Sequence, residues 1–240
     1  MELHKMVDQR RSVRTFSNRP VEQAQLDDLK EFIKTAKPLY PGIKVEIRIV
    51  SNSDVRFYLP WKSQQLLAVF SENKPGYLEN AGFLLQQVDL YLQSHGIGSC
   101  WLGLGKLRNM DIVPENMDFV ILMAFGHTKQ DFLRTNPSQF KRKTMEDISD
   151  IPDDRLEPAR LAPSSTNSQP WYFVHDGDVI HAYRNAAGER RHKMLGYMNK
   201  IDMGIALSHL YVANAERFHF VRDESAPARE GLDHIGSVRL

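Results

Sequence analysis

Cysteine and long apolar runs are nearly absent from this sequence. The 240 residues include a single cysteine, Cys100, which excludes an internal disulfide and any metal site built from several cysteines. No stretch approaches the roughly 18 consecutive apolar residues that a membrane-spanning helix needs. The N-terminus also lacks the apolar core of a signal peptide. We therefore expect a cytoplasmic protein that does not act in a membrane.

An excess of charge of one sign is lacking as well. Lys and Arg number 31 and Asp and Glu number 30, which gives a net charge of +1. No basic stripe with interleaved aromatic residues is present, so we expect no nucleic-acid partner. The nine histidines show no close metal-ligand spacing, and we expect no metal. The hydrophobic share of 42% is ordinary for a globular protein, with one large core or two tightly joined halves.

Two polar motifs carry the chemistry that the sequence does contain. Residues 162–171, APSSTNSQPW, place Ser, Thr and Asn side chains between two prolines and ahead of an apolar stretch. Such side chains bond to the backbone in turns, and shaped loops often bind ligands; a capped surface turn is the alternative. Residues 10–16, RRSVRTF, hold three guanidinium groups and a hydroxyl, which suit phosphate oxygens; a solvated surface is the alternative.

Two further motifs complete a family pattern. Residues 96–103 read GIGSCWLG, and residues 124–127 read AFGH, followed about fourteen residues later by the basic triplet 141–143. The glycines at 96, 98, 103 and 105 lack the spacing of a dinucleotide-binding fingerprint, so we interpret them as backbone turns. Together, the four motifs resemble the FMN-dependent nitroreductase family.

The chain also contains a candidate internal repeat. Apolar residues at helical spacing predict one long helix from Tyr77 to beyond Tyr91 and another from Tyr197 to beyond Tyr211. Each is preceded by a basic run, a helix start and a strand-like run, with the two strands predicted at 45–50 and 171–174. Further predictions are a helix at 21–37 and buried strands at 64–70 and 119–125. Duplication predicts two halves, 1–135 and 136–240.

The resemblance implies an α+β fold with antiparallel or mixed sheets flanked by helices, and here with two related halves in one chain. In the family, FMN lies at a dimer interface, so the halves would form a fused pseudo-dimer. Residues 36–41, AKPLYP, lack the Ser and Asn of the loop at 162–171. One flavin site would therefore be intact and the other lost. We expect a monomer, and a further dimer is the alternative.

Residue roles follow from the resemblance alone. Arg10, Ser12 and Arg14 would hold the FMN phosphate and ribityl chain, with Arg11 beside them, and Lys141 and Lys143 would add positive charge. Pro163, Ser164, Ser165 and Asn167 would approach the isoalloxazine ring from the other half. Leu102 and Gly103 would offer backbone N–H groups near flavin N5. No side chain is assigned as catalytic.

The implied function is an FMN-dependent NAD(P)H oxidoreductase. NADH or NADPH would deliver hydride, and a nitroaromatic, quinone or similar electron-poor small molecule would then accept the electrons. In such a cycle the cofactor carries the chemistry and the protein binds and orients it. A flavin-binding sensor or storage protein without turnover is the alternative, and a purely structural protein without a cofactor is a third.

Overall fold

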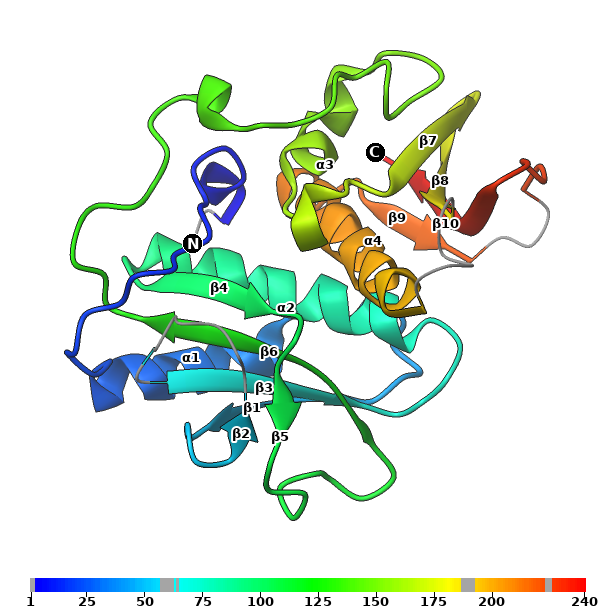
Figure 1. The fold of residues 1–240 in the computed structure, drawn as a ribbon. Helices are drawn as coiled ribbons and strands as arrows, with labels where there is room; N and C mark the ends of the chain where they lie inside the picture. Colours follow the sequence, from blue (N-terminus) through cyan, green and yellow to red (C-terminus); the bar gives the residue numbers. More distant parts are fainter. Residues whose placement is uncertain (1–2, 57–62, 64, 187–192, 223–225) are drawn as a thin grey trace.

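Two four-stranded antiparallel sheets and two long helices form the framework of the chain (Figure 1). The structure, a computed structural model, describes residues 3–56, 63, 65–186, 193–222 and 226–240. The first sheet has the order β1 (Val45–Val50), β3 (Gln65–Ser71), β6 (Asp118–Gly126) and β4 (Gly98–Leu102). The second has the order β7 (Trp171–Asp176), β8 (Val179–Asn185), β10 (Leu232–Arg239) and β9 (His219–Val221).

The helices flank these sheets. They are α1 (Gln23–Thr35), α2 (Tyr77–Ser94), the short α3 (Glu157–Leu161) and α4 (Lys193–Ala213). Two short strands, β2 (Val55–Arg56) and β5 (Lys106–Leu107), form a small separate ribbon. Among the described residues, 3-10 turns lie at Leu3–Met6, Pro137–Gln139, Asp154–Leu156 and Ser165–Asn167. The predicted α+β architecture with antiparallel sheets is confirmed.

Most individual elements agree with the sequence pattern. The predicted strands at 45–50, 119–125 and 171–174 and the helices after Tyr77 and Tyr197 are all present within a few residues. The strand predicted at 64–70 is β3, although Gln64 lies outside the described residues. The interpretation of Gly98 as a turn was wrong, because its backbone pairs with Gly126 as the first residue of β4. Gly96, with a φ of 71°, does form the preceding turn.

The first sheet is buried on both faces. Alternate residues of a strand point to opposite faces. In β3, Leu67 and Val69 pack into a core shared with α2 and the second sheet, whereas Leu66, Ala68 and Phe70 pack into a separate cluster. This double burial explains why β3 and β6 read as nearly continuous apolar runs in the sequence.

The two sheets share one connectivity. In each, the first two strands along the chain are neighbours, a long helix follows, and the last strand inserts beside the second. Thus β1, β3, α2, β4 and β6 correspond in order to β7, β8, α4, β9 and β10. The correspondence is one of topology, and common descent by duplication stays a prediction.

Helices α2 and α4 pack closely between the two sheets (Figure 1). A Cβ atom at Gly82 would collide with the carbonyl oxygen of Ile201, and one at Gly204 would collide with the carbonyl oxygen of Glu79. Both obstacles are backbone atoms, which cannot rotate away. The two glycines therefore allow the helix backbones to touch where any side chain would separate them.

Substituting Ala for Gly82 or Gly204 is expected to destabilise the protein. Forced separation of packed elements costs about 1–3 kcal/mol, which outweighs the gain of about 1 kcal/mol from replacing a helical glycine by alanine. Urea denaturation of Gly82→Ala and Gly204→Ala would measure this loss. Gly42→Ala is the control, because no atom lies within 4 Å of the added Cβ there. An unchanged midpoint in both helix variants would contradict the proposed backbone contact.

Candidate functional site

A cavity of about 810 Å³ lies between the parts of the chain that carry the two sheets. This junction cavity has the size of typical small-molecule sites. One wall comes from the N-terminal arm and the sheet region around β4 and β6, namely Ser12, Arg14, Cys100, Trp101, Gly103, Leu104 and Ile121. The other comes from the loop before β7 and from α4, namely Pro163, Ser164, Ser165, Thr166, Met194, Leu195, Met198, Ile201, Asp202 and Ile205.

The loop at 162–170 has an unusual backbone that α4 holds in place. Thr166, Asn167 and Gln169 have positive φ angles of 52°, 59° and 48°. The backbone N–H of Ser165 donates to both carboxylate oxygens of Asp202, with N···O distances of 3.0 and 3.1 Å. Residues with positive φ are strained, so the surrounding contacts must fix them. The loop is thus a shaped cavity wall.

Asp202 is the buried acid of this site. Asp202 is only 3% exposed, and the Ser168 hydroxyl, 3.5 Å from Oδ2, is a further donor to the carboxyl group. Burial raises the pKa of Asp202 to about 8, although the bonds from Ser165 and Ser168 oppose this effect. The carboxyl group is therefore largely protonated at neutral pH. A neutral acid in an apolar cavity wall can hold the loop without placing a full negative charge beside a ligand.

A buried polar network positions the opposite wall. Nε of Arg10 lies 3.0 Å from Oδ2 of Asp89, and both side chains are inaccessible to solvent. Gln93 donates to Asp89 at 3.1 Å and accepts from the backbone N–H of Arg11 at 2.8 Å. The arm then runs beside β4, where the N–H of Val13 donates to the carbonyl of Ser99 at 2.8 Å. These bonds fix Ser12 and Arg14 at the cavity.

The cavity brings together six of the twelve residues that the sequence proposes as cofactor ligands. Ser12 and Arg14 line one wall, and Gly103 lies at the end of β4. Pro163, Ser164 and Ser165 line the facing wall. Residues more than 140 positions apart in the sequence therefore face one space, as the proposed arrangement of two halves requires.

The other six lie outside this lining, each for a local reason. Arg10 is buried against Asp89, and Arg11 is exposed. Leu102 is fully buried in the second apolar cluster, so its side chain does not face the cavity. Lys143 donates to the carbonyl of Gln169 at 3.0 Å. The last two are Lys141, which is exposed, and Asn167, whose amide donates to the Lys141 carbonyl at 3.0 Å.

Within the basic triplet, Lys143 bonds to Gln169 of the loop, Lys141 is exposed, and Arg142 also turns toward the loop. Its guanidinium donates to Oδ1 of Asn167 at 2.7 Å and to the carbonyl of Leu161 at 3.2 and 3.3 Å. Burial and the neighbouring cations Arg10 and Arg134 lower the pKa of Arg142 to about 10. The triplet thus braces the loop at 162–170 from behind.

The α4 residues are the part of the site that sequence reasoning missed. The helical spacing of Met198, Ile201 and Ile205 predicts a helix but not a binding site, and these residues line the junction cavity. Asp202 interrupts this apolar stripe, and a lone acid among apolar helix positions was the available signal. Cys100, Trp101 and Ile121 complete the apolar wall from the first sheet.

Comparison with known proteins supplies the family context. A family model described as "Putative TM nitroreductase" matches residues 2–214. The crystal structure of a "putative nitroreductase" from Thermotoga maritima MSB8 has a TM-score of 0.70 and 20% identity, covering 100% of this chain and 94% of that one. This similarity shows the same fold. No protein with a curated description matches the chain.

Two further solved structures cover a smaller share of the chain. A nitroreductase family protein from Clostridium difficile 630 has a TM-score of 0.48 and 14% identity, covering 62% of this chain and 97% of that one. An FMN-dependent nitroreductase from Clostridium difficile R20291 has a TM-score of 0.44 and 16% identity, covering 57% and 93%. Within the residues described, no helix is both long and apolar enough to cross a bilayer.

Asp202 is expected to make stability depend on pH. In the unfolded chain its pKa returns toward 3.8, so folding must increasingly protonate it as the pH rises from about 4 to about 8. Its contribution should lower the free energy of unfolding by up to about 1.4 kcal/mol per pH unit in that window. Asp202→Asn should remove this slope, as measured by urea denaturation at pH 5, 6, 7 and 8.

The control for this measurement is Asp178→Asn in the exposed β7–β8 turn, which should keep the wild-type slope. Identical pH dependence in wild type and Asp202→Asn would show that the Asp202 carboxyl is already ionised in the folded protein.

Proposed function

The chain belongs to the nitroreductase family described by the model that matches residues 2–214, and on that premise we propose that it is an FMN-dependent oxidoreductase. We propose that NADH or NADPH supplies the hydride and that an electron-poor small molecule, such as a nitroaromatic compound or a quinone, accepts the electrons. The observation that carries the proposal is the junction cavity, where the Arg-Ser-x-Arg arm meets the Pro-Ser-Ser loop.

The residues of this cavity fit a flavin. A flat aromatic ring system needs apolar walls, and Trp101, Ile121, Met198 and Ile205 provide them. The phosphate-bearing chain of FMN needs hydrogen-bond donors, and Ser12 and Arg14 lie at the same cavity. Nε1 of Trp101 is buried without a hydrogen-bond partner among the described residues, which leaves one donor for a bound group.

When bound, FMN would accept hydride from the nicotinamide and pass electrons to the acceptor. The chain's own residues would bind and orient the cofactor and would exclude water from it. Ser12 and Arg14 would hold the phosphate-bearing chain, and the loop at Pro163–Ser165 would cover one side of the ring. The backbone N–H groups near Gly103 would face flavin N5. Because the acid of Asp202 is largely neutral, it would not oppose negative charge that develops in the cavity.

The arrangement of two halves supports a single flavin site per chain. We propose that residues 1–135 and 136–240 descend from one duplicated unit and form a pseudo-dimer within the chain. The common strand order of the two sheets supports this division. The contact of α2 with α4 already covers the surface that would join two separate copies, so we propose a monomer.

The flavin hypothesis predicts that substitution of the arm weakens FMN binding. Arg14→Gln and Ser12→Ala should each raise the dissociation constant for FMN about tenfold or more, because each removes donors that would meet the phosphate or ribityl oxygens. Quenching of flavin fluorescence on titration of the apoprotein would give the constants. The same titration, with the chromophore identified by mass, should give one FMN per chain.

Arg11→Gln is the matched control, since Arg11 is exposed and outside the cavity lining. Equal FMN affinity in Arg14→Gln and wild type would refute the assignment of the arm. Two flavins per chain would refute the single-site pseudo-dimer. Oxidation of NADH or NADPH with a quinone acceptor distinguishes an enzyme from a flavin-binding protein without turnover.

A further inference from the structure

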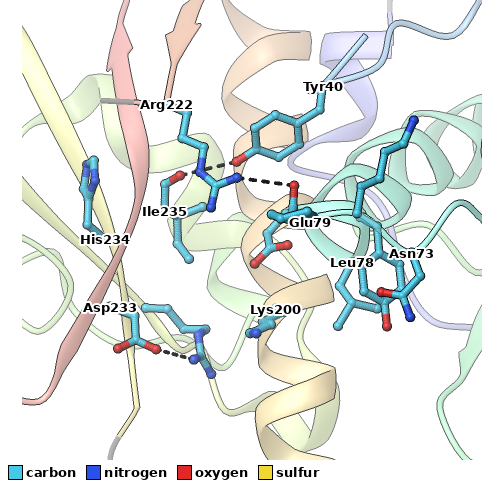
Figure 2. Close-up of a pocket in the computed structure, with 14 residues that line it drawn as sticks. Tyr40, Asn73, Leu78, Glu79, Lys200, Arg222, Asp233, His234 and Ile235 are labelled. Carbon is cyan, nitrogen blue, oxygen red and sulfur yellow. Dashed lines mark hydrogen bonds and ion pairs between the residues drawn. The ribbon is translucent and has the colours of Figure 1, made fainter. Parts of the chain in front are cut away.

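A second cavity, of about 420 Å³, lies at the N-terminal end of α2 (Figure 2). We name it the polar cavity. Its lining includes Tyr40, Glu79, Arg184, Lys200, Arg222 and Asp233. The residues come from the loop before β1, from both long helices and from the second sheet. Its charged lining contrasts with the mainly apolar walls of the junction cavity.

The polar cavity occupies the topological counterpart of the junction cavity. The junction cavity lies between the loop before β7, the first turns of α4 and the end of β4. The polar cavity lies between the loop before β1, the first turn of α2 and the residue after β9. These elements correspond one to one in the shared strand order. The scaffold therefore builds two cavities, and their side chains set different chemistry.

The side chain of Tyr40 reduces the space in the polar cavity. Its hydroxyl donates to the carbonyl of Ile235 at 3.3 Å, and its ring packs so closely on Gly76 that an added Cβ would lie 2.7 Å away. The amide of Asn80 fixes the Tyr40 backbone, because Oδ1 accepts from the Tyr40 N–H at 2.9 Å. The ring thus stands at the position that corresponds to the serine loop of the junction cavity.

Cationic groups surround the remaining space. Lys200 is exposed and makes no hydrogen bond or ion pair within the part of the chain that the structure describes. Arg222 donates one bond to the carbonyl of Pro75 at 3.3 Å, which leaves most of the five guanidinium donors available. Arg184 is buried and paired with Asp233. Lys200 and Arg222 therefore offer charge to an incoming group.

Glu79 is the buried acid of the polar cavity. The residue is 6% exposed, and its side chain points into the space between Ile235 and Lys200 (Figure 2). Its carboxyl group bonds to no other residue among those described, and burial raises its pKa although Lys200, Arg184 and Arg222 oppose the rise.

The start of α2 adds to the same preference. This helix has 18 residues, and Gly76 at its N-cap supplies no side-chain hydrogen bond to the first turn. The helix dipole favours negative charge at such a position. The two available cations and the helix start therefore both indicate a negatively charged ligand for this cavity.

We propose that the polar cavity binds a small organic anion whose phosphate or carboxylate group contacts Lys200 and Arg222. The side chains of Tyr40, Leu78 and Ile235 provide apolar contact for the body of such a molecule. This binding is separate from the proposed flavin site, and it does not depend on the flavin hypothesis.

Isothermal titration calorimetry of the full chain tests the proposal with three probes: inorganic phosphate, phenyl phosphate and benzoate. We expect saturable binding of one probe molecule per chain, with phenyl phosphate tighter than phosphate if the apolar wall contributes. Comparison of phenyl phosphate with benzoate distinguishes the two acid groups. Lys200→Gln and Arg222→Gln should each weaken binding about tenfold, because each removes a charge-assisted bond.

Matched variants give each outcome a clear meaning. Arg217→Gln removes an exposed cation outside the cavity and should leave the affinity unchanged. Glu79→Gln removes the competing negative charge and should bind phenyl phosphate at least as tightly as wild type at pH 8. No saturable binding of any probe, or equal affinity in wild type, Lys200→Gln and Arg222→Gln, would overturn the proposal. Binding lost in Arg14→Gln but kept in Lys200→Gln would place the anion in the junction cavity and would also overturn it.

Discussion

The reciprocal backbone contact of α2 with α4 is the constraint on which the rest of the structure depends. Gly82 lies on the carbonyl of Ile201, and Gly204 lies on the carbonyl of Glu79. This contact sets the separation of the two sheets, because each long helix packs against its own sheet and against the other helix. It also sets where the two buried acids stand. Glu79 and Asp202 lie within one helical turn of the contact, and each lines one of the two cavities.

Buried polar groups complement this apolar contact by fixing the chain segments that reach the junction cavity. The pairing of Arg10 with Asp89 removes two charges from water, which is costly and gives weak net stabilisation. Its effect is positional, since the network of Asp89, Gln93 and Ser99 leaves the N-terminal arm one arrangement beside β4. Arg10 therefore positions the arm without lining the cavity, whereas Ser12 and Arg14 line it.

The sequence predicted most helices and strands closely, and half of the residues that it proposes as cofactor ligands line one cavity, while their role stays a prediction. Apolar periodicity reports burial, so it identified β1, β3, β6, α2 and α4 closely. The motifs placed Ser12, Arg14 and Pro163–Ser165 at one cavity. Periodicity does not say which face of a helix meets a cavity, so the spacing of Met198 and Ile205 predicted a helix and not their place in the site. Nor does composition give side-chain direction in a turn with positive φ, which is why Asn167 points to Arg142 and not to the cavity.

The two cavities show that the backbone framework determines where a cavity forms, whereas the side chains that line it determine what it can bind. Corresponding loops, helix starts and strand ends create space twice, but serine hydroxyls and apolar α4 residues define one space and Tyr40 with cations defines the other. In both places an acid near the helix crossing is held away from water, and burial raises its pKa. The common feature therefore arises from the packing of α2 on α4, whereas ligand preference arises from a few side chains at the rim. Function in this fold belongs to the site and not to the framework.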